Sequence, residues 1–125
     1  MEGDFRLGKK ITEYAVILEL HGDLSKASEV ELLGLYDWER GLEQDKRFLV
    51  INFSNVPYIN SIGIAVLIRI VRALSKTGIR TFGYGLSPHY QKLFRMVGLT
   101  GYMMIYPDEY SILQRIERLQ EDVSE

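Results

Sequence analysis

The chain has 125 residues, a formal charge of −2 and no cysteine. This length is enough for one domain with its own core, and the charge gives no basic surface of the kind that binds nucleic acids. The lack of cysteine excludes disulfides, thiolate chemistry and cysteine-based zinc sites. We therefore expect a single domain over residues 1–125 without a nucleic-acid partner.

The sequence also gives no signal of secretion, membrane insertion or metal binding. Residues 1–4 have neither the basic start nor the apolar stretch of a signal peptide, and the longest apolar run, 64–68, is too short to span a membrane. The only histidines, His21 and His89, are far apart and have no carboxylates at metal-ligand spacing. We expect a cytoplasmic protein with no membrane contact, metal or cofactor.

The first part of the chain predicts a β-hairpin and then a helix. Residues 5–11 and 14–21 are rich in β-branched and aromatic side chains with partial alternation, which is typical of strands. Ser28 and Glu31 have the spacing of a capping box, which predicts a helix over 28–43. The apolar residues that support this helix recur every three or four positions: Leu32, Leu35, Trp38 and Leu42.

The middle of the chain predicts a buried strand, a helix and another strand. Residues 48–53 are almost continuously apolar, which is typical of a strand covered on both faces inside a sheet. A loop is predicted for 54–59 and a second helix for 62–76, which ends near Gly78. A further strand follows at 80–85.

The last part of the chain predicts a helix, a short strand and a terminal helix. Ser87 has the position of an N-cap for a helix over 88–97, and Gly98 ends that helix. Residues 102–106 form the last predicted strand, and Asp108 begins the terminal helix.

The predicted order is therefore β-β-α-β-α-β-α-β-α. Such an alternation after an initial hairpin indicates an α/β fold with a mixed sheet of about five strands and about four helices packed against it. We expect the core to span roughly residues 5–119 and a fraying tail to begin at about residue 121.

The helix predicted for 62–76 has two faces when its residues are placed 100° apart. One face is apolar and is expected to face the core: Gly63, Val66, Leu67, Ile70, Val71 and Leu74. The opposite face mixes apolar and basic residues and is expected to be exposed: Ile62, Ala65, Ile68, Arg69, Arg72 and Lys76. The mixed face is a candidate docking surface, although basic residues in such a place most often form only the solvated side of a helix.

Ser61 stands immediately before this helix and fits two different roles. Its hydroxyl can cap the helix, because serine is a common N-cap residue. It can also accept a phosphoryl group, because the helix dipole and the free backbone N–H groups favour negative charge there. Local chemistry alone leaves both roles open.

Two other patterns are assigned to structure rather than chemistry. Gly83 and Gly85 lie between a strand and a helix, but no third glycine follows at the spacing of a dinucleotide-binding loop. The chain has eight tyrosines, which could form an interaction surface. Because several fall in predicted strands, where aromatic packing is common, most are expected in the core.

The segment 49–64 closely resembles the signature of STAS domains, specifically of bacterial anti-sigma factor antagonists. The family pattern is an apolar strand, a loop and Asp-Ser-x-Gly-Leu at the start of a helix, and Asn60-Ser61-Ile62-Gly63 follows that pattern here. Further positions match in the family's order: Gly22, Asp23, Leu24, Ser87, Pro88, Leu93, Gly98 and Leu99.

This resemblance covers roughly residues 14–116 and implies a STAS fold. Two positions differ from the usual family residues, because Asn60 stands in place of an acidic residue and Ser25 in place of an aspartate. Asparagine keeps the shape and hydrogen-bonding reach of aspartate but removes one negative charge beside the serine hydroxyl.

The resemblance also implies a function. In the antagonist family the serine that corresponds to Ser61 is phosphorylated by an anti-sigma factor with serine kinase activity, and the unphosphorylated form binds this kinase and frees its sigma factor. A serine phosphatase resets the switch, and the sigma factor responds only indirectly. We expect a monomer or weak dimer that is not an enzyme. The expected partner-binding residues are Ser25, Asn60, Ser61, Ile62, Gly63, Ala65, Ile68, Arg69 and Arg72.

STAS domains serve several roles, so a second function remains open. The chain can instead be a constitutive scaffold or an accessory subunit of a transporter or signalling complex, in which the same helix docks permanently. An enzyme is a weaker alternative, because no nucleophile is combined with a positioned base or a metal site.

Overall fold

The computed structural model describes residues 4–43 and 45–124. The predicted order of strands and longer helices is confirmed, with two short 3₁₀ helices added in the described part of the chain. The elements are β1 (Arg6–Ile11), β2 (Ala15–His21), α1 (Lys26–Leu35), η1 (Trp38–Arg40), β3 (Phe48–Asn55), α2 (Ser61–Lys76), β4 (Arg80–Tyr84), α3 (Pro88–Met96), η2 (Leu99–Gly101), β5 (Met103–Ile105) and α4 (Glu109–Ser124).

The five strands form one mixed sheet in the order β1-β2-β3-β4-β5. β1 is antiparallel to β2, and the remaining neighbours are parallel. Leu49 of β3 pairs with Val16 of β2 on one side and with Thr81 of β4 on the other. β3 is therefore the central strand, as its continuous apolar sequence predicts.

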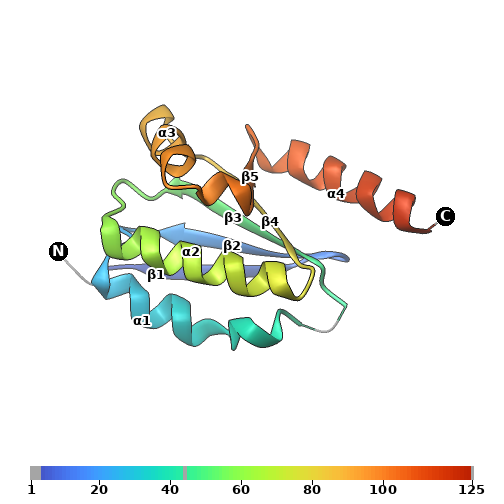
Figure 1. Cartoon of the computed structure of the whole chain (residues 1–125), viewed down its shortest axis with the longest axis horizontal. Coiled ribbons are helices and arrows are strands. Elements are labelled where there is room, and N and C mark those ends of the chain that lie inside the picture. Colours follow the sequence, from blue (N-terminus) through green and yellow to red (C-terminus); the bar gives the residue numbers. More distant parts are fainter. Residues whose placement is uncertain (1–3, 44, 125) are drawn as a thin grey trace.

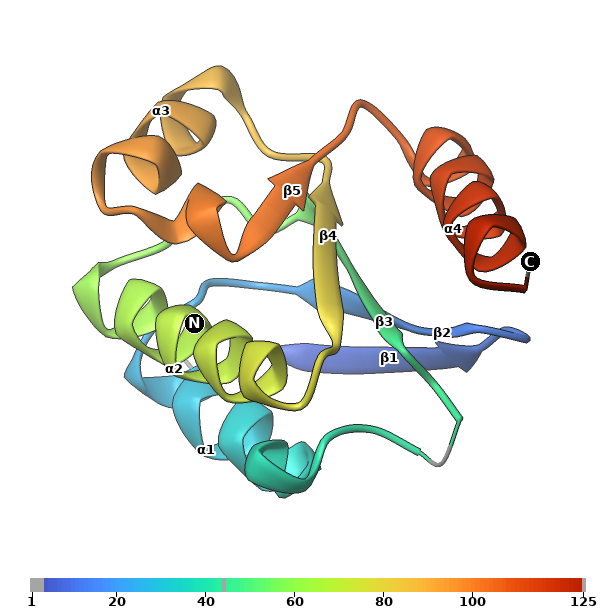
Figure 2. The ribbon, with the colours of Figure 1, turned by 45° about the vertical axis from the view of Figure 1, so that its right-hand side comes forward.

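Helices cover both faces of the sheet (Figures 1 and 2). α1, α2 and α3 lie on one face and α4 lies on the other. Leu49 and Ile51 of β3 belong to the larger core beneath the first three helices. Val50 points the other way and packs with Ile112 and Ile116 of α4. The sheet is thus the middle of three layers.

The first helix begins earlier than predicted, because Ser28 rather than Glu31 completes its N-terminal hydrogen bonds. Ser25 precedes the helix, and its backbone N–H donates to Ser28 Oγ at 2.9 Å. Ser28 Oγ in turn donates to the carbonyl of Ser25 at 2.8 Å. These bonds satisfy the backbone at the helix start, so Lys26 is the first helical residue.

The same helix ends earlier than the predicted boundary at residue 43. α1 stops at Leu35, and Tyr36 takes an extended conformation with φ −140° and ψ 157°. The chain then turns inward at η1, where the indole N–H of Trp38 donates to the carbonyl of Leu32 at 2.9 Å. The helical spacing of the apolar residues therefore arises from a helix and a separate 3₁₀ turn.

The expectation that most tyrosines pack in the core is confirmed in part, because five of the eight are partly buried and pack against it: Tyr14, Tyr36, Tyr84, Tyr90 and Tyr106. None of the eight is fully buried, and Tyr110 has 70% of its surface exposed. The partly buried ones lie at the core's edge, where their hydroxyls reach polar groups. Tyr84 donates to Glu109 Oε1 at 2.9 Å, which joins β4 to α4, and burial together with this bond raises the pKa of Tyr84.

The remaining boundaries agree with the predictions to within one or two residues, except at the C-terminal end. α4 continues to Ser124, so residues 121–124, which are predicted as a tail, belong to the helix. In residues 4–43 and 45–124 no helix is both long and apolar enough to cross a membrane.

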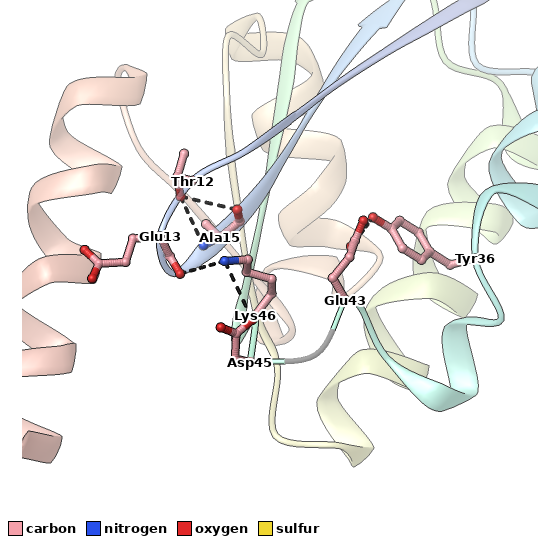
Figure 3. A network of polar contacts seen from close by, with 7 residues as sticks. All are labelled: Thr12, Glu13, Ala15, Tyr36, Glu43, Asp45 and Lys46. Carbon is pink, nitrogen blue, oxygen red and sulfur yellow. Dashed lines mark hydrogen bonds and ion pairs between the residues drawn. The ribbon is translucent and has the colours of Figure 1, made fainter.

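A polar network joins the turn between β1 and β2 to the segment before β3 (Figure 3). Lys46 Nζ donates to the carbonyl of Glu13 at 2.8 Å and lies 3.7 Å from Asp45 Oδ1. Thr12 Oγ1 accepts from the backbone N–H of Ala15 at 3.1 Å. These contacts fix the amino ends of β2 and β3, at the opposite end of the sheet from Ser61.

Candidate functional site

Ser61 lies where the loops after β2 and β3 leave the same edge of the sheet. These strands are parallel, so their carboxyl ends lie side by side. The two loops are hydrogen-bonded to each other: the Leu24 N–H donates to the carbonyl of Tyr58 at 2.9 Å, and the Asn60 N–H donates to the carbonyl of Leu24 at 3.0 Å. This pairing holds the starts of α1 and α2 together.

The loop before α2 is also held by α3. Ile59 is buried, and its backbone N–H donates to the hydroxyl of Tyr90 at 3.0 Å. Tyr90 stands in the first turn of α3, where its own N–H donates to Oγ of the N-cap Ser87 at 3.3 Å. The helix start at Ser87 therefore positions the tyrosine that holds the loop, and Ser61 begins α2 from a loop fixed on two sides.

Asn60, and not Ser61, caps α2. The side chain Oδ1 of Asn60 accepts from the backbone N–H of Gly63 at 3.0 Å, and the residue has the extended backbone of an N-cap, with φ −99° and ψ −175°. Ser61 is the first helical residue and is exposed, and no hydrogen bond among the described residues uses its hydroxyl. The cap interpretation of Ser61 is therefore wrong.

Gly63 has a structural role that differs from the predicted contact with a partner. It is buried, and a Cβ at this position would clash with the backbone carbonyl of Leu24. Only glycine allows α2 to approach the preceding loop this closely. Gly63 therefore presents no surface to a partner but fixes where Ser61 stands.

The start of α2 favours an added negative charge at Ser61, while the carboxylate of Glu29 in α1 lines the same cavity. The first turn of α2, which the structure describes in full, contains no acidic side chain. The helix dipole places positive partial charge at this end, and the backbone N–H groups of the first turn point toward it. A phosphoryl group on Ser61 would therefore be tolerated by the domain itself.

The two faces of α2 lie mostly as predicted. All six residues predicted to face the core are buried: Gly63, Val66, Leu67, Ile70, Val71 and Leu74. On the outer side, Ala65, Arg69, Arg72 and Lys76 are exposed, and Ile62 has 36% of its surface exposed. Ile68 differs from the prediction, because it is half-buried and packs against the core.

Two cavities lie between the outer side of α2 and α1, and together they form what we call the α1–α2 groove. A cavity of about 350 Å³ begins at Ser61, and one of about 560 Å³ continues to Lys76. They are adjacent, because Leu33, Ala65 and Arg69 line both. Sequence patterns identified the α2 wall but missed the other wall, which is formed by Glu29, Leu33, Tyr36, Asp37, Trp38 and Glu39.

Tyr36, in the far wall of this groove, is held by a charged cluster. Its hydroxyl donates to Glu43 Oε1 at 2.5 Å, and Figure 3 shows Tyr36 facing Glu43. Lys9 Nζ donates to Glu43 Oε2 at 2.9 Å and lies 4.9 Å from the centre of the Tyr36 ring. Burial, followed by the bond to Glu43, raises the pKa of Tyr36. Burial alone would raise the pKa of Glu43, but the bonds from Tyr36 and Lys9 lower it on balance.

Apart from Gly63 and Ile68, which pack inward, the predicted site residues fall into two groups. Ser25 and Asn60 are half-buried in the paired loops, while Ser61, Ile62, Ala65, Arg69 and Arg72 form one continuous outer strip on α2. In the part of the chain that the structure describes, no cluster of three or more His, Asp or Glu side chains could hold a metal ion.

The chain belongs to the STAS domain family, whose family model matches residues 7–112. The predicted fold family is therefore confirmed, and comparison with curated proteins gives no match. Among solved structures, a substituted form of RsbS from Moorella thermoacetica is 18% identical, with a TM-score of 0.76, covering 93% of this chain and 98% of that chain.

Three further structures have the same fold. The Bacillus protein SpoIIAA in its phosphorylated form is 24% identical, with a TM-score of 0.66 and coverage of 90% of this chain and 98% of that chain. SpoIIAA has also been solved unphosphorylated and is described as an anti-sigma factor antagonist. A sulfate transporter family protein from Wolinella succinogenes is 18% identical, with a TM-score of 0.63 and coverage of 77% and 80%. At these identities the similarity establishes the fold.

Proposed function

We propose that this STAS domain is an anti-sigma factor antagonist that is switched off by phosphorylation of Ser61. The observation that carries the proposal is the position of Ser61, which is exposed as the first residue of α2 while Asn60 supplies the cap. The fold similarity to SpoIIAA, which exists in unphosphorylated and phosphorylated forms, supports it. In this proposal the protein is a kinase substrate and not an enzyme.

The physical basis of the switch is a change of surface charge. Phosphoserine carries about −1.5 to −2 charges at neutral pH, whereas the serine hydroxyl is neutral. At the start of α2 the helix dipole stabilises this charge by roughly 0.3–1 kcal/mol, so the domain stays folded. A partner surface seated against Ser61 meets like-charge repulsion or desolvation, and every 1.4 kcal/mol or so of penalty weakens binding about tenfold.

The proposed partner is an anti-sigma factor with serine kinase activity, bound by the unphosphorylated form so that a sigma factor is released. A serine phosphatase restores the unphosphorylated form, and the setting is the bacterial cytoplasm. The proposed unit is one STAS domain that is a monomer or weak dimer. Its proposed contact residues are Ser25, Asn60, Ser61, Ile62, Ala65, Ile68, Arg69 and Arg72.

Phosphorylation by an anti-sigma factor kinase from the same bacterium tests the proposal. The purified protein is incubated with that kinase and ATP, and its intact mass is measured by mass spectrometry. We expect one phosphoryl group on the wild type and on Ser75→Ala, a matched control at the other end of α2, and none on Ser61→Ala. The absence of phosphorylation, or its persistence in Ser61→Ala, would refute the switch.

A second candidate function is a constitutive scaffold or accessory subunit of a transporter or signalling complex. The observation that favours it is the STAS fold shared with a sulfate transporter family protein. Titration calorimetry with the physiological partner separates the two functions. Ser61→Glu weakens binding if Ser61 is a switch, whereas a permanent scaffold binds the wild type and this variant equally.

A further inference from the structure

We infer that the α1–α2 groove binds an acidic amphipathic helix of a partner protein. The groove and its charge are independent of phosphorylation, but the effect assigned below to Ser61 rests on the proposed function. The inference therefore adds the chemistry of the partner segment to the proposed switch.

The shape of the groove suits a helix. Its two adjacent cavities share Leu33, Ala65 and Arg69 and follow α2 from Ser61 to Lys76. At 1.5 Å per residue this helix is roughly 24 Å long, so the groove is elongated and differs from a closed pocket for a small molecule. A third helix laid between α1 and α2 can follow it over its length.

The floor of the groove is apolar and includes small side chains. Leu33 and Ile68 are half-buried hydrophobic residues, and Ala65 and Ala73 are small enough for a helix to approach closely. Apolar side chains on one face of the occupant would cover this floor. This arrangement is the usual basis for the binding of an amphipathic helix in a groove.

The unpaired charged side chains in the groove determine the sign of the charge that the occupant must carry. Arg69 and Arg72 are exposed, stand three residues apart on α2, and form no ion pair among the described residues. Lys76 by contrast lies 3.9 Å from Glu39. Two free guanidinium groups one turn apart match carboxylates one turn apart on a partner helix, because arginine binds carboxylates with two parallel hydrogen bonds.

Glu29 on the opposite wall fixes the orientation of the occupant. It lines the cavity nearest Ser61 and forms no ion pair within the described residues. The carboxylates of the partner helix therefore face α2 and stay away from α1. Since Ser61 lines the same cavity, a phosphoryl group there places negative charge beside an acidic occupant and repels it.

Selection from a displayed library of helical peptides, using the whole unphosphorylated chain as bait, tests this inference. Enriched peptides should carry Asp or Glu residues one turn apart beside an apolar stripe. In ¹⁵N-labelled protein they should shift the amide resonances of α1 and α2, and the single tryptophan, Trp38, should report binding by fluorescence. Affinity should fall as salt is raised.

Paired charge reversals locate the binding surface. Arg69→Glu with Arg72→Glu should weaken the selected peptides roughly tenfold or more, because both guanidinium groups are lost and the charge is reversed. The matched control is Lys92→Glu with Arg95→Glu, two exposed basic residues three positions apart on α3, and it should leave the affinity unchanged. Circular dichroism checks that both variants are folded.

Several results would overturn the inference: no enrichment above background, enriched peptides that are neutral or basic, equal losses in the two variants, or resonance shifts confined to other surfaces. Self-association abolished by the α2 variant alone would make a second copy the occupant and would also overturn it. The selection uses no kinase, so failure of Ser61 phosphorylation leaves its result intact. If Ser61→Glu binds the acidic peptides as well as the wild type, the repulsion assigned to Ser61 is wrong.

Discussion

The backbone N–H of Gly63 donates to Asn60 Oδ1 at 3.0 Å, and this bond closes the first turn of α2 around Ser61. Gly63 at the same time packs against Leu24, where a side chain would not fit. Asn60 and Gly63, the two motif residues on either side, therefore both have structural roles. Ser61 is exposed, and no hydrogen bond among the described residues uses its hydroxyl.

Replacing the cap at Asn60 should weaken the start of α2. Asn60→Ala leaves the Gly63 N–H without its acceptor, and we expect the free energy of unfolding to fall by about 1 kcal/mol. Asn60→Asp keeps the acceptor and adds a negative charge at the positive helix end, so it should equal or exceed the wild type by roughly 0.3–1 kcal/mol at pH 7. Urea denaturation measures both changes.

Two results would contradict this account of the cap. Equal stability of Asn60→Ala and the wild type would mean that the bond to Gly63 contributes nothing. A loss in Asn60→Asp as large as in Asn60→Ala would mean that the amide group, and not the acceptor oxygen, is required at this position.

A methyl group added at Gly63 should destabilise the fold, whereas one added at Gly34 should not. Gly63→Ala would press its Cβ against the backbone of Leu24, so α2 or the paired loop must shift, at a cost of roughly 1–3 kcal/mol. Gly34 lies in α1, and a methyl group added there would meet no atom within 4 Å, so Gly34→Ala should stabilise the helix by roughly 0.5–1 kcal/mol. Thermal unfolding, monitored by circular dichroism, compares the stability of the two variants. Stabilisation by Gly63→Ala would contradict the close approach of α2 to the backbone of Leu24.

Elements with strong local patterns could be predicted from the sequence. The continuous apolar run of β3 predicts a strand in the interior of the sheet, because a strand covered on both faces typically has this composition. The amphipathic pattern of α2 likewise predicts its buried face correctly, since packing against the sheet selects residues at helical spacing.

Features that depend on competition between neighbours could not be predicted. Asn60 and Ser61 are both good capping residues, and only the structure shows that Asn60 accepts the bond from Gly63 and caps the helix. Trp38 has helical spacing from Leu35 but reaches the core through a separate turn. The far wall of the α1–α2 groove arises from packing between segments, so no local pattern marks it.

The cluster of Glu43 with Tyr36 and Lys9 should contribute stability that acid removes. The pKa of Glu43 is lowered in the fold, so its contribution is fully present above the usual value of 4.5 and is lost as the pH falls through the lowered value. Glu43→Gln should therefore be less stable than the wild type at neutral pH, and the difference should shrink below about pH 4.5.

Urea titrations measure this pH dependence. They run from roughly pH 3 to pH 8, so that they include the range in which carboxylates titrate. Glu31→Gln is the matched control, because Glu31 is exposed on α1 and forms no ion pair among the described residues. A stability difference for Glu43→Gln that stays constant over the whole range would show that the loss comes from packing and not from the charge.

Opposite ends of α2 should respond in opposite ways to a negative charge. Ser61→Asp places the charge at the positive end of the helix and should raise the free energy of unfolding by roughly 0.3–1 kcal/mol, whereas Ser75→Asp, in the last turn, should lower it by a similar amount. Urea denaturation at low salt measures both, and added salt should reduce the difference. If Ser61→Asp destabilises the domain as much as Ser75→Asp does, phosphorylation would act by disturbing the fold, and the proposed switch through surface charge alone would be wrong.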